Sequence, residues 1–219
     1  MTIATTMPDN TLEVLYELFC EWYDVNTPTL MEFRTFSEEK FSNIWTNWWF
    51  AKKEKQVRMD AYLNKYKPLF LMNNSDTIMP EGMDVRSTIV WTVGWIILWD
   101  QVSRNIFRNS AEAYATDHKA RKLVETLMPF WNTLPIPIRV SMILVYIHSE
   151  DINDLDMTNK LLADIKLPMQ NYPSVWTSLT GIAKNHYDRM TMFGRIPERN
   201  KFLNRMSTPE EMNYMNSIY

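Results

Sequence analysis

Glycine is unusually scarce in this chain, at 4 of 219 residues, against an average usage of about 7%. Hairpin turns, left-handed bends and phosphate-binding loops depend on glycine, because it adopts positive φ without a steric cost. A sheet-rich protein or a dinucleotide-binding α/β protein is therefore not expected. With 46% hydrophobic and 22% charged residues, the composition is that of an ordinary globular protein.

Apolar residues recur at steps of three and four along most of the chain, which is the period of one face of an α-helix. In residues 11–24 this face carries Leu12, Leu15 and Phe19, and Thr11 is placed to cap the helix. The predicted helices cover residues 11–24, 38–66, 85–107, 111–127, 138–147, 155–165 and 174–192, and a last helix starts at residue 209. The sequence thus predicts an all-α fold of seven to eight antiparallel helices.

Turn-forming and capping residues separate these helices. Ser37, Ser110 and Thr208 are placed as N-caps, and Pro68 is expected to end the second helix. Residues 73–82 collect turn formers and are expected to be a loop. We expect a single helical domain over residues 1–219, with residues 1–10 as a flexible tail.

Charge and segment composition exclude several classes of protein. The formal net charge is −3 and the isoelectric point is near 5.7, so nucleic acid is not an expected partner. Cys20 is the only cysteine and can form no internal disulfide. Neither a signal peptide at residues 1–10 nor a membrane span is expected, since the longest apolar run, residues 89–99, is too short. These features predict a cytoplasmic protein.

Five polar residues share one side of the predicted helix over residues 85–107. At 100° per residue they fall within an arc of about 140°, and they are Asp100, Gln101, Arg104, Asn105 and Arg108. Arginine presents paired donors that match carboxylate or phosphate oxygens, so the stripe indicates an anion site. The alternative is structural, with Asp100 pairing with Arg104 at the four-residue spacing.

A histidine and two acids follow the aliphatic run that ends at residue 147. His148, Glu150 and Asp151 could supply a general acid and base, or part of a metal site. No metal is predicted, because the spacing is not that of a metal-binding HExxH helix and the chain has three histidines in all.

The densest cationic cluster lies near the C-terminus. One face of the predicted helix carries His186, Arg189 and Phe193. Gly194 is expected to end this helix in a left-handed conformation. The cluster that follows consists of Arg195, Arg199, Asn200, Asn204 and Arg205. A solvated loop is the simpler interpretation, but interleaved apolar residues would hold the loop against the core and partly desolvate its charges. These residues are Phe193, Ile196, Pro197, Phe202 and Leu203.

These strings together carry a resemblance to a known family. The matching segments are Leu98–Arg108, Tyr114–Asp117, His148–Asp151, His186, Phe193–Asn200, Leu203–Arg205 and Ser207–Glu211, with looser counterparts at Phe19–Tyr23 and Trp49–Phe50. The sequence resembles the domain-of-unknown-function family 924, an all-helical, tetratricopeptide-like group found mainly in bacteria. The resemblance implies a tetratricopeptide-like helical bundle and one shared polar cleft, and it implies no activity.

Two positions depart from the family pattern. Glu198 stands where the family usually has histidine, and Asn204 stands where it has glycine. A chemistry that needed that histidine would be absent here or carried by a carboxylate. Asparagine is the least costly replacement for a left-handed glycine.

Three functions remain open. The first is a ligand-binding protein or enzyme in which arginines hold a small phosphate- or carboxylate-bearing ligand and a histidine or Glu150 handles a proton. The second is an interaction scaffold with exposed aromatics and a protein partner, and the third makes the arginines structural, bonding backbone carbonyls. The first hypothesis names His148, Glu150 and His186 as catalytic residues, and Asp100, Gln101, Arg104, Asn105, Arg108, Arg195, Arg199, Asn200 and Arg205 as ligand-binding residues. No cofactor is called for.

Overall fold

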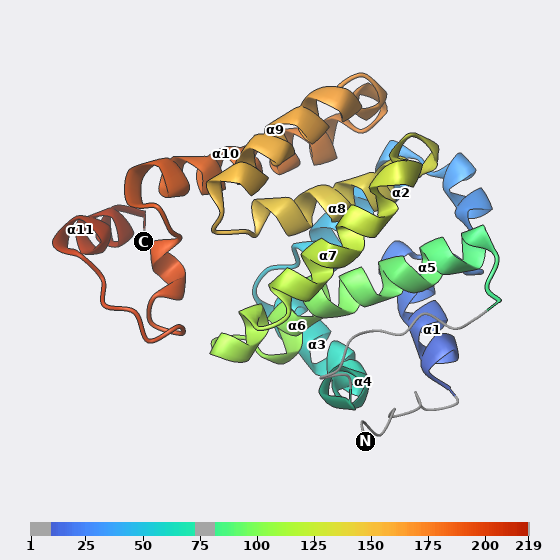
Figure 1. Cartoon of the computed structure of the whole chain (residues 1–219), viewed down its shortest axis with the longest axis horizontal. Helices are drawn as coiled ribbons and strands as arrows, with labels where there is room; N and C mark the ends of the chain where they lie inside the picture. Colours follow the sequence, from blue (N-terminus) through green and yellow to red (C-terminus); the bar gives the residue numbers. More distant parts are fainter. Residues whose placement is uncertain (1–9, 73–81, 219) are drawn as a thin grey trace.

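The computed structural model describes residues 10–72 and 82–218, and in these residues it contains helices and no strand. The all-α prediction is confirmed (Figure 1). The α-helices are α1 (Thr11–Tyr23), α2 (Glu38–Ile44), α3 (Glu54–Leu63), α4 (Lys67–Met72), α5 (Val85–Ile96), α6 (Ser103–Ile106), α7 (Asp117–Leu127), α8 (Ile136–Ile147), α9 (Ile152–Ile165), α10 (Pro173–Phe193) and α11 (Pro209–Ile218).

Shorter helical turns join them. The 3₁₀ turns are η1 (Leu30–Thr35), η3 (Asn64–Tyr66), η5 (Ala111–Tyr114), η6 (Met128–Thr133), η7 (Pro168–Asn171) and η8 (Pro197–Arg199), and the π-helical turns are η2 (Trp45–Trp49) and η4 (Ile97–Val102). The predicted tail and most of the predicted loop at residues 73–82 lie outside the described residues.

Several predicted helix starts are confirmed by their caps. The Ser37 side chain accepts a hydrogen bond from the backbone N–H of Lys40 at the start of α2. Thr208 and Glu211 form the reciprocal pair of a capping box at the start of α11. The prediction for Thr11 is wrong, because Asn10 occupies the cap position and Thr11 is the first helical residue.

The predicted continuous helix over residues 38–66 is also wrong, because the structure interrupts it. The chain leaves the helix after η2, and α3 begins after Lys53, which has φ 54°. Pro68 does not end the helical region, since it lies inside α4, where a proline in the first turn costs no hydrogen bond. Ser110 does not cap a helix over residues 111–127, since η5 intervenes and α7 begins at Asp117.

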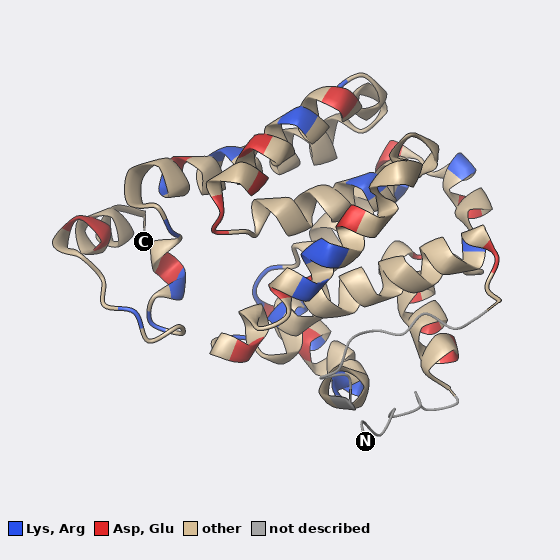
Figure 2. Cartoon of the chain, viewed as in Figure 1, with Lys and Arg blue, Asp and Glu red and all other residues tan. Residues whose placement is uncertain are grey.

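The core is built around α5 and α8. Helix α5 packs against α1 and α7, and α8 packs against α7, α9 and α10, so that these helices lie side by side in Figure 1. Charged residues are almost absent from α5 and α8 (Figure 2), because both helices are buried over most of their surface. In the described residues, no helix is both long enough and apolar enough to span a membrane.

The C-terminal segment, residues 194–218, packs against the end of this core beside α9 and α10 (Figure 1). It begins at Gly194, whose left-handed conformation (φ 67°) ends α10 as predicted. Asn204 also has positive φ, at 52°, a conformation that asparagine tolerates better than most residues. The segment contributes Ile196 to a small apolar cluster with Leu155 and Met190. It carries η8 and therefore Arg199.

Candidate functional site

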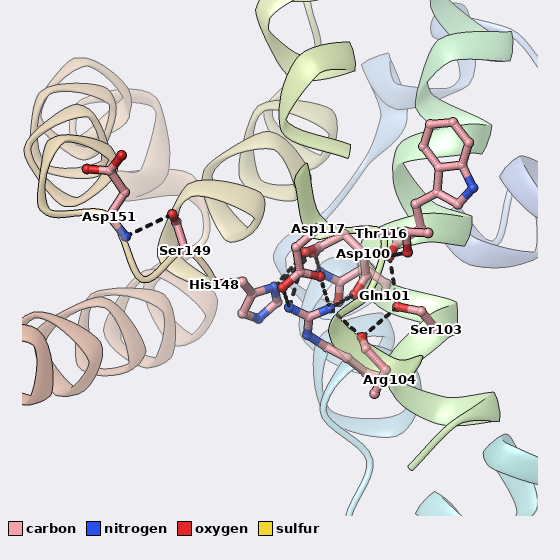
Figure 3. Close-up of polar contacts among 11 residues, drawn as sticks. Asp100, Gln101, Ser103, Arg104, Thr116, Asp117, His148, Ser149 and Asp151 are labelled. Carbon is pink, nitrogen blue, oxygen red and sulfur yellow. Dashed lines mark hydrogen bonds and ion pairs between the residues drawn. The ribbon is translucent and has the colours of Figure 1, made fainter. Parts of the chain in front are cut away.

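A buried carboxylate and a histidine meet where η4 faces the end of α8. The Nδ1 atom of His148 lies 2.9 Å from each carboxylate oxygen of Asp100, as Figure 3 shows. Asp100 is fully buried, and its side chain also accepts a hydrogen bond from Gln101. Burial on its own raises the pKa of Asp100, but the contacts with His148 and the Arg104 cation outweigh it and hold that pKa below its ordinary value. Asp100 is therefore an ionised acceptor for the imidazole N–H.

The guanidinium of Arg104 donates hydrogen bonds to several protein acceptors. It donates two hydrogen bonds of 2.9 Å to the carboxylate of Asp117 and further bonds to the carbonyls of Asp100 and Ala113 (Figure 3). An oxygen of Asp100 lies 3.5 Å away, at the predicted four-residue spacing. These contacts leave Arg104 little capacity for a ligand.

Two adjoining cavities open next to this network. The first has a volume of about 380 Å³ and is lined by Arg104, Arg108, Asn109, Ala113, Tyr114, His148, His186, Arg189, Ile196, Glu198, Arg199 and Phe202. The second has a volume of about 320 Å³ and is lined by Tyr114, Asp117, His118, Arg121, Val145, His148, Ser149, Glu150, Arg199 and Leu203. Because Tyr114, His148 and Arg199 line both, we call the two cavities together the polar cleft.

Arg199 differs from the other arginines of the first cavity. Its residue is 8% exposed, and within the described residues its guanidinium has neither a hydrogen bond nor an ion-pair partner. It lies over the ring of Tyr114, 4.8 Å from the ring centroid. Burial and the nearby Arg104 lower the pKa of Arg199 from its ordinary value, and the group stays charged because that value is far above 7.

The other three cavity arginines each have a carboxylate partner. Arg104 pairs with Asp117, as described above. The guanidinium of Arg108 donates to Asp60 at 2.6 and 2.8 Å, and Arg189 donates to Glu198 at 2.6 Å.

His148 and His186, the two histidines that line the first cavity, each present an unprotonated Nε2 atom. The Nδ1 of His186 lies 3.0 Å from the carbonyl oxygen of Ile182. The ring centroids of His148 and His186 are 6.1 Å apart. Burial and the Arg104 cation lower the pKa of His148 below its ordinary value, and burial and His148 lower the pKa of His186 to about 3. A carboxylate or carbonyl only accepts, so in each neutral ring Nδ1 carries the proton and Nε2 the lone pair.

Several predicted site residues lie elsewhere. Arg195 donates to both oxygens of Glu211 and to the carbonyl of Met206, and Asn200 also donates to Glu211. Arg205 donates to both oxygens of Glu150 and to the carbonyl of Ile196. Arg195, Asn200 and Arg205 line neither cavity.

Glu150 connects the turn after α8 to the C-terminal segment. Besides its two contacts with Arg205, it accepts a hydrogen bond of 2.8 Å from the backbone N–H of Ile196. Burial raises the pKa of Glu150, but the bonds from Arg205 and Ile196 outweigh it and hold the pKa below its ordinary value. Glu150 lines the second cavity, yet both of its carboxylate oxygens are engaged.

The predicted polar stripe divides between two partners. Asp100 and Arg104 face η5, α7 and the end of α8, whereas Asn105 and Arg108 both donate to Asp60 of α3. Gln101 is buried against Asp100. Of the stripe, Arg104 and Arg108 line the first cavity. No group of three or more His, Cys, Asp or Glu side chains suited to a metal ion occurs in the described part of the chain.

A known protein family matches most of this chain. The sequence profile of a family described as a bacterial protein of unknown function (DUF924) matches residues 32–218. The chain belongs to this family. No curated protein matches the chain.

A solved structure is similar to this fold. The chain is similar to a protein of unknown function from Agrobacterium tumefaciens, with a TM-score of 0.55 and 23% sequence identity over 80% of this chain and 92% of that one. Such a likeness concerns the fold alone.

Two residues of the family strings matter more than sequence reasoning indicated. The guanidinium groups of Arg104 and Arg199 both lie near the ring of Tyr114, 5.6 and 4.8 Å from its centroid, and Asp117 holds Arg104. Both belong to one string that the resemblance singled out, which was the available signal. Glu198 lines the first cavity and holds Arg189.

Proposed function

We propose that this protein binds a small molecule bearing a phosphate or carboxylate group in the polar cleft, with Arg199 as the cation that receives it. The observation that carries the proposal is the guanidinium of Arg199, which belongs to a residue only 8% exposed, faces both cavities and has no hydrogen bond or ion pair among the described residues. A charged donor that is largely shielded from bulk water without a protein acceptor is costly. An anion in the cavity would supply the missing acceptor with the bidentate geometry that arginine favours.

His148 is the residue proposed to exchange a proton with the ligand. Its Nδ1–H is fixed by Asp100, so its Nε2 is the free atom in a cavity that it shares with Arg199. A histidine oriented in this way by a carboxylate is suited to act as a general base. Asp100 serves as a positioning residue, and Glu150 is left out of the proton transfer because Arg205 and Ile196 engage it.

The test is a thermal-denaturation series with inorganic phosphate and with succinate, on the wild type and two variants. A ligand at about 100 times its Kd adds about 2.7 kcal/mol of stability, which for a chain of this size raises Tm by several degrees. Arg199→Gln should lose this rise. Arg139→Gln, whose guanidinium donates to the carbonyls of Leu134 and Asn132 away from the cleft, should keep it. Equal rises in both variants, or none in the wild type, would refute an anion site at Arg199.

The interaction-scaffold alternative gains no support from the aromatic residues. All nine tryptophans lie in the described residues, and each is buried or half-buried. Tyr62 and Tyr187 are the exposed tyrosines of the described part, at 46% and 40%. An aromatic surface for a partner protein is therefore not evident in these residues, and tetratricopeptide-like character stays a prediction.

A further inference from the structure

The first cavity contains unused hydrogen-bond acceptors as well as unused donors. Within the described part of the chain, the Nε2 atoms of His148 and His186 accept no hydrogen bond. Each ring is fixed by its Nδ1–H bond, so neither can turn its proton toward the cavity without losing that bond. The cavity therefore offers lone pairs from two imidazoles and N–H groups from Arg199.

A carboxylate or the dianion of a phosphate monoester would satisfy only half of this set. Its ionised oxygens accept hydrogen bonds from Arg199, but they cannot donate to Nε2. A site from which the ligand displaces water favours a ligand that pairs with all of its polar atoms, because an unpaired group loses the hydrogen bond it had in water. The ligand that completes the cavity must bring a donor together with its anionic group.

That donor is a hydroxyl rather than an ammonium group. Four arginines line the cavity around the two rings. Burial is the main cause that lowers the pKa of both histidines, Arg104 adds to it at His148 against the opposing Asp100 carboxylate, and Arg199 and Arg189 add to it at His186, so positive charge is disfavoured at both rings. An ammonium group placed between them would meet the same cations. A hydroxyl donates to Nε2 without adding charge, and its oxygen can accept from a neighbouring guanidinium.

We infer that the ligand of the polar cleft is a hydroxylated anion, such as a sugar phosphate or a hydroxy acid, with its anionic group on Arg199 and at least one hydroxyl on the Nε2 atoms of His148 and His186. This inference rests on the proposed function, since it assigns the substrate class of the same site. The volume of the first cavity, about 380 Å³, suits a small ligand of this kind.

The test compares ligands that differ only in their hydroxyl groups. Isothermal titration calorimetry near pH 7.5 measures the Kd of malate against succinate and of glycerol 3-phosphate against propyl phosphate, so that one pair represents carboxylates and the other phosphates. In at least one pair, the hydroxylated member should bind ten times more tightly or better. His186→Phe should bring that ratio close to one while the ligand without hydroxyls keeps its affinity within about threefold.

A second histidine variant serves as the control. His118→Phe alters a histidine that lines the second cavity but not the first, and it should keep the wild-type ratio. Ratios near one in the wild type, with binding that still depends on Arg199, would overturn the hydroxyl inference and leave the proposed function intact. If none of the four ligands binds, the proposed function fails together with this inference.

Discussion

Lys53 adopts a backbone conformation that suits glycine far better than lysine, with φ 54° and ψ −127°. It occupies the cap position of α3, where glycine is also well tolerated. We expect Lys53→Gly to raise the free energy of unfolding by about 1 kcal/mol, because the relief of strain exceeds the entropy that glycine adds to the unfolded chain. Urea titration followed by circular dichroism measures the change.

A neighbouring lysine provides the control. Lys52 is exposed, and its φ is not positive, so Lys52→Gly relieves no strain and should not stabilise the protein. Equal losses of stability in the two variants would show that the conformation of Lys53 is not strained.

The two cavity histidines predict a pH dependence of stability. The pKa values of His148 and His186 lie below their ordinary values in the folded protein, so the unfolded chain binds more protons than the folded one below about pH 6.5. This stability is present above pH 6.5 and is lost as the pH falls, by at most about 1.4 kcal/mol per pH unit for each histidine.

Urea titrations at a series of pH values between 6.5 and 4.5 measure this slope. His186→Phe should reduce it. A slope that is the same in the wild type and in His186→Phe would mean that His186 is protonated as readily when folded as when unfolded.

Sequence reasoning found the right residue types for the candidate site. It could not distinguish the arginines that pair with a carboxylate from Arg199, which does not. The carboxylate partner of Arg104 lies 13 residues away, that of Arg108 48 residues away and that of Arg205 55 residues away. No local spacing reveals such pairs, because they depend on how the helices pack. Positive φ at Asn204 was predictable, since it follows from a local conformation that few residues tolerate.

At the scale of elements, helices whose start is marked by a proline were predicted almost to the residue. Helices α8 and α10 begin and end within two residues of the predicted bounds. The interruption near Lys53 and the π-helical turns η2 and η4 were not predictable, because apolar residues continue at helical spacing through both turns and only packing decides the local hydrogen bonding.

The contact between α1 and α5 gives a prediction about glycine. A Cβ atom added at Gly94 would lie 3.1 Å from both the backbone oxygen and the Cβ of Leu15, whereas one added at Gly181 meets nothing within 4 Å. Both glycines are inside helices. Gly181→Ala should raise stability by about 0.5–1 kcal/mol through helix propensity, and Gly94→Ala should lower it by about 1–2 kcal/mol because the helices must separate.

Thermal denaturation of the two variants in parallel measures the difference. The comparison is matched, since each variant adds one methyl group to a helical glycine. An increase in Tm for Gly94→Ala similar to that for Gly181→Ala would show that α1 adjusts to the added methyl at no cost.

At the scale of the whole molecule, Glu150 fastens the C-terminal segment to the core. Glu150→Gln removes the charge that receives Arg205 and weakens the bond to the backbone of Ile196. We expect it to lower the free energy of unfolding by about 2 kcal/mol. Because the same segment carries Arg199, the variant should also lose affinity for inorganic phosphate and be cleaved faster by proteases within residues 194–218.

The exposed pair of Lys184 and Asp188 provides the comparison. The two side chains are 72% and 40% exposed, so Asp188→Asn should change stability by less than about 0.5 kcal/mol and leave proteolysis unchanged. Identical proteolysis of Glu150→Gln and the wild type would mean that the remaining contacts, such as the ion pair of Arg189 with Glu198 and the apolar cluster around Ile196, hold the segment without Glu150.

The fold class was predictable from the whole sequence, but the cleft was not. Glycine scarcity and helical periodicity suffice for an all-α architecture. The cleft needs η5, the ends of α8 and α10, and η8 to converge, and such convergence of distant segments is a property of tertiary packing. The family strings indicated that these parts belong together without giving their geometry.

The tryptophans are distributed unevenly with respect to this architecture. They occur from α1 to α10, at positions between 22 and 176, and the C-terminal segment contains none. Intrinsic fluorescence will therefore report the unfolding of the helical core, where seven indoles are buried, but the segment that carries Arg199 can detach with little change in emission. A fluorescence titration that looks native does not establish an intact cleft, and a dye attached within residues 194–218 would be needed to observe its opening.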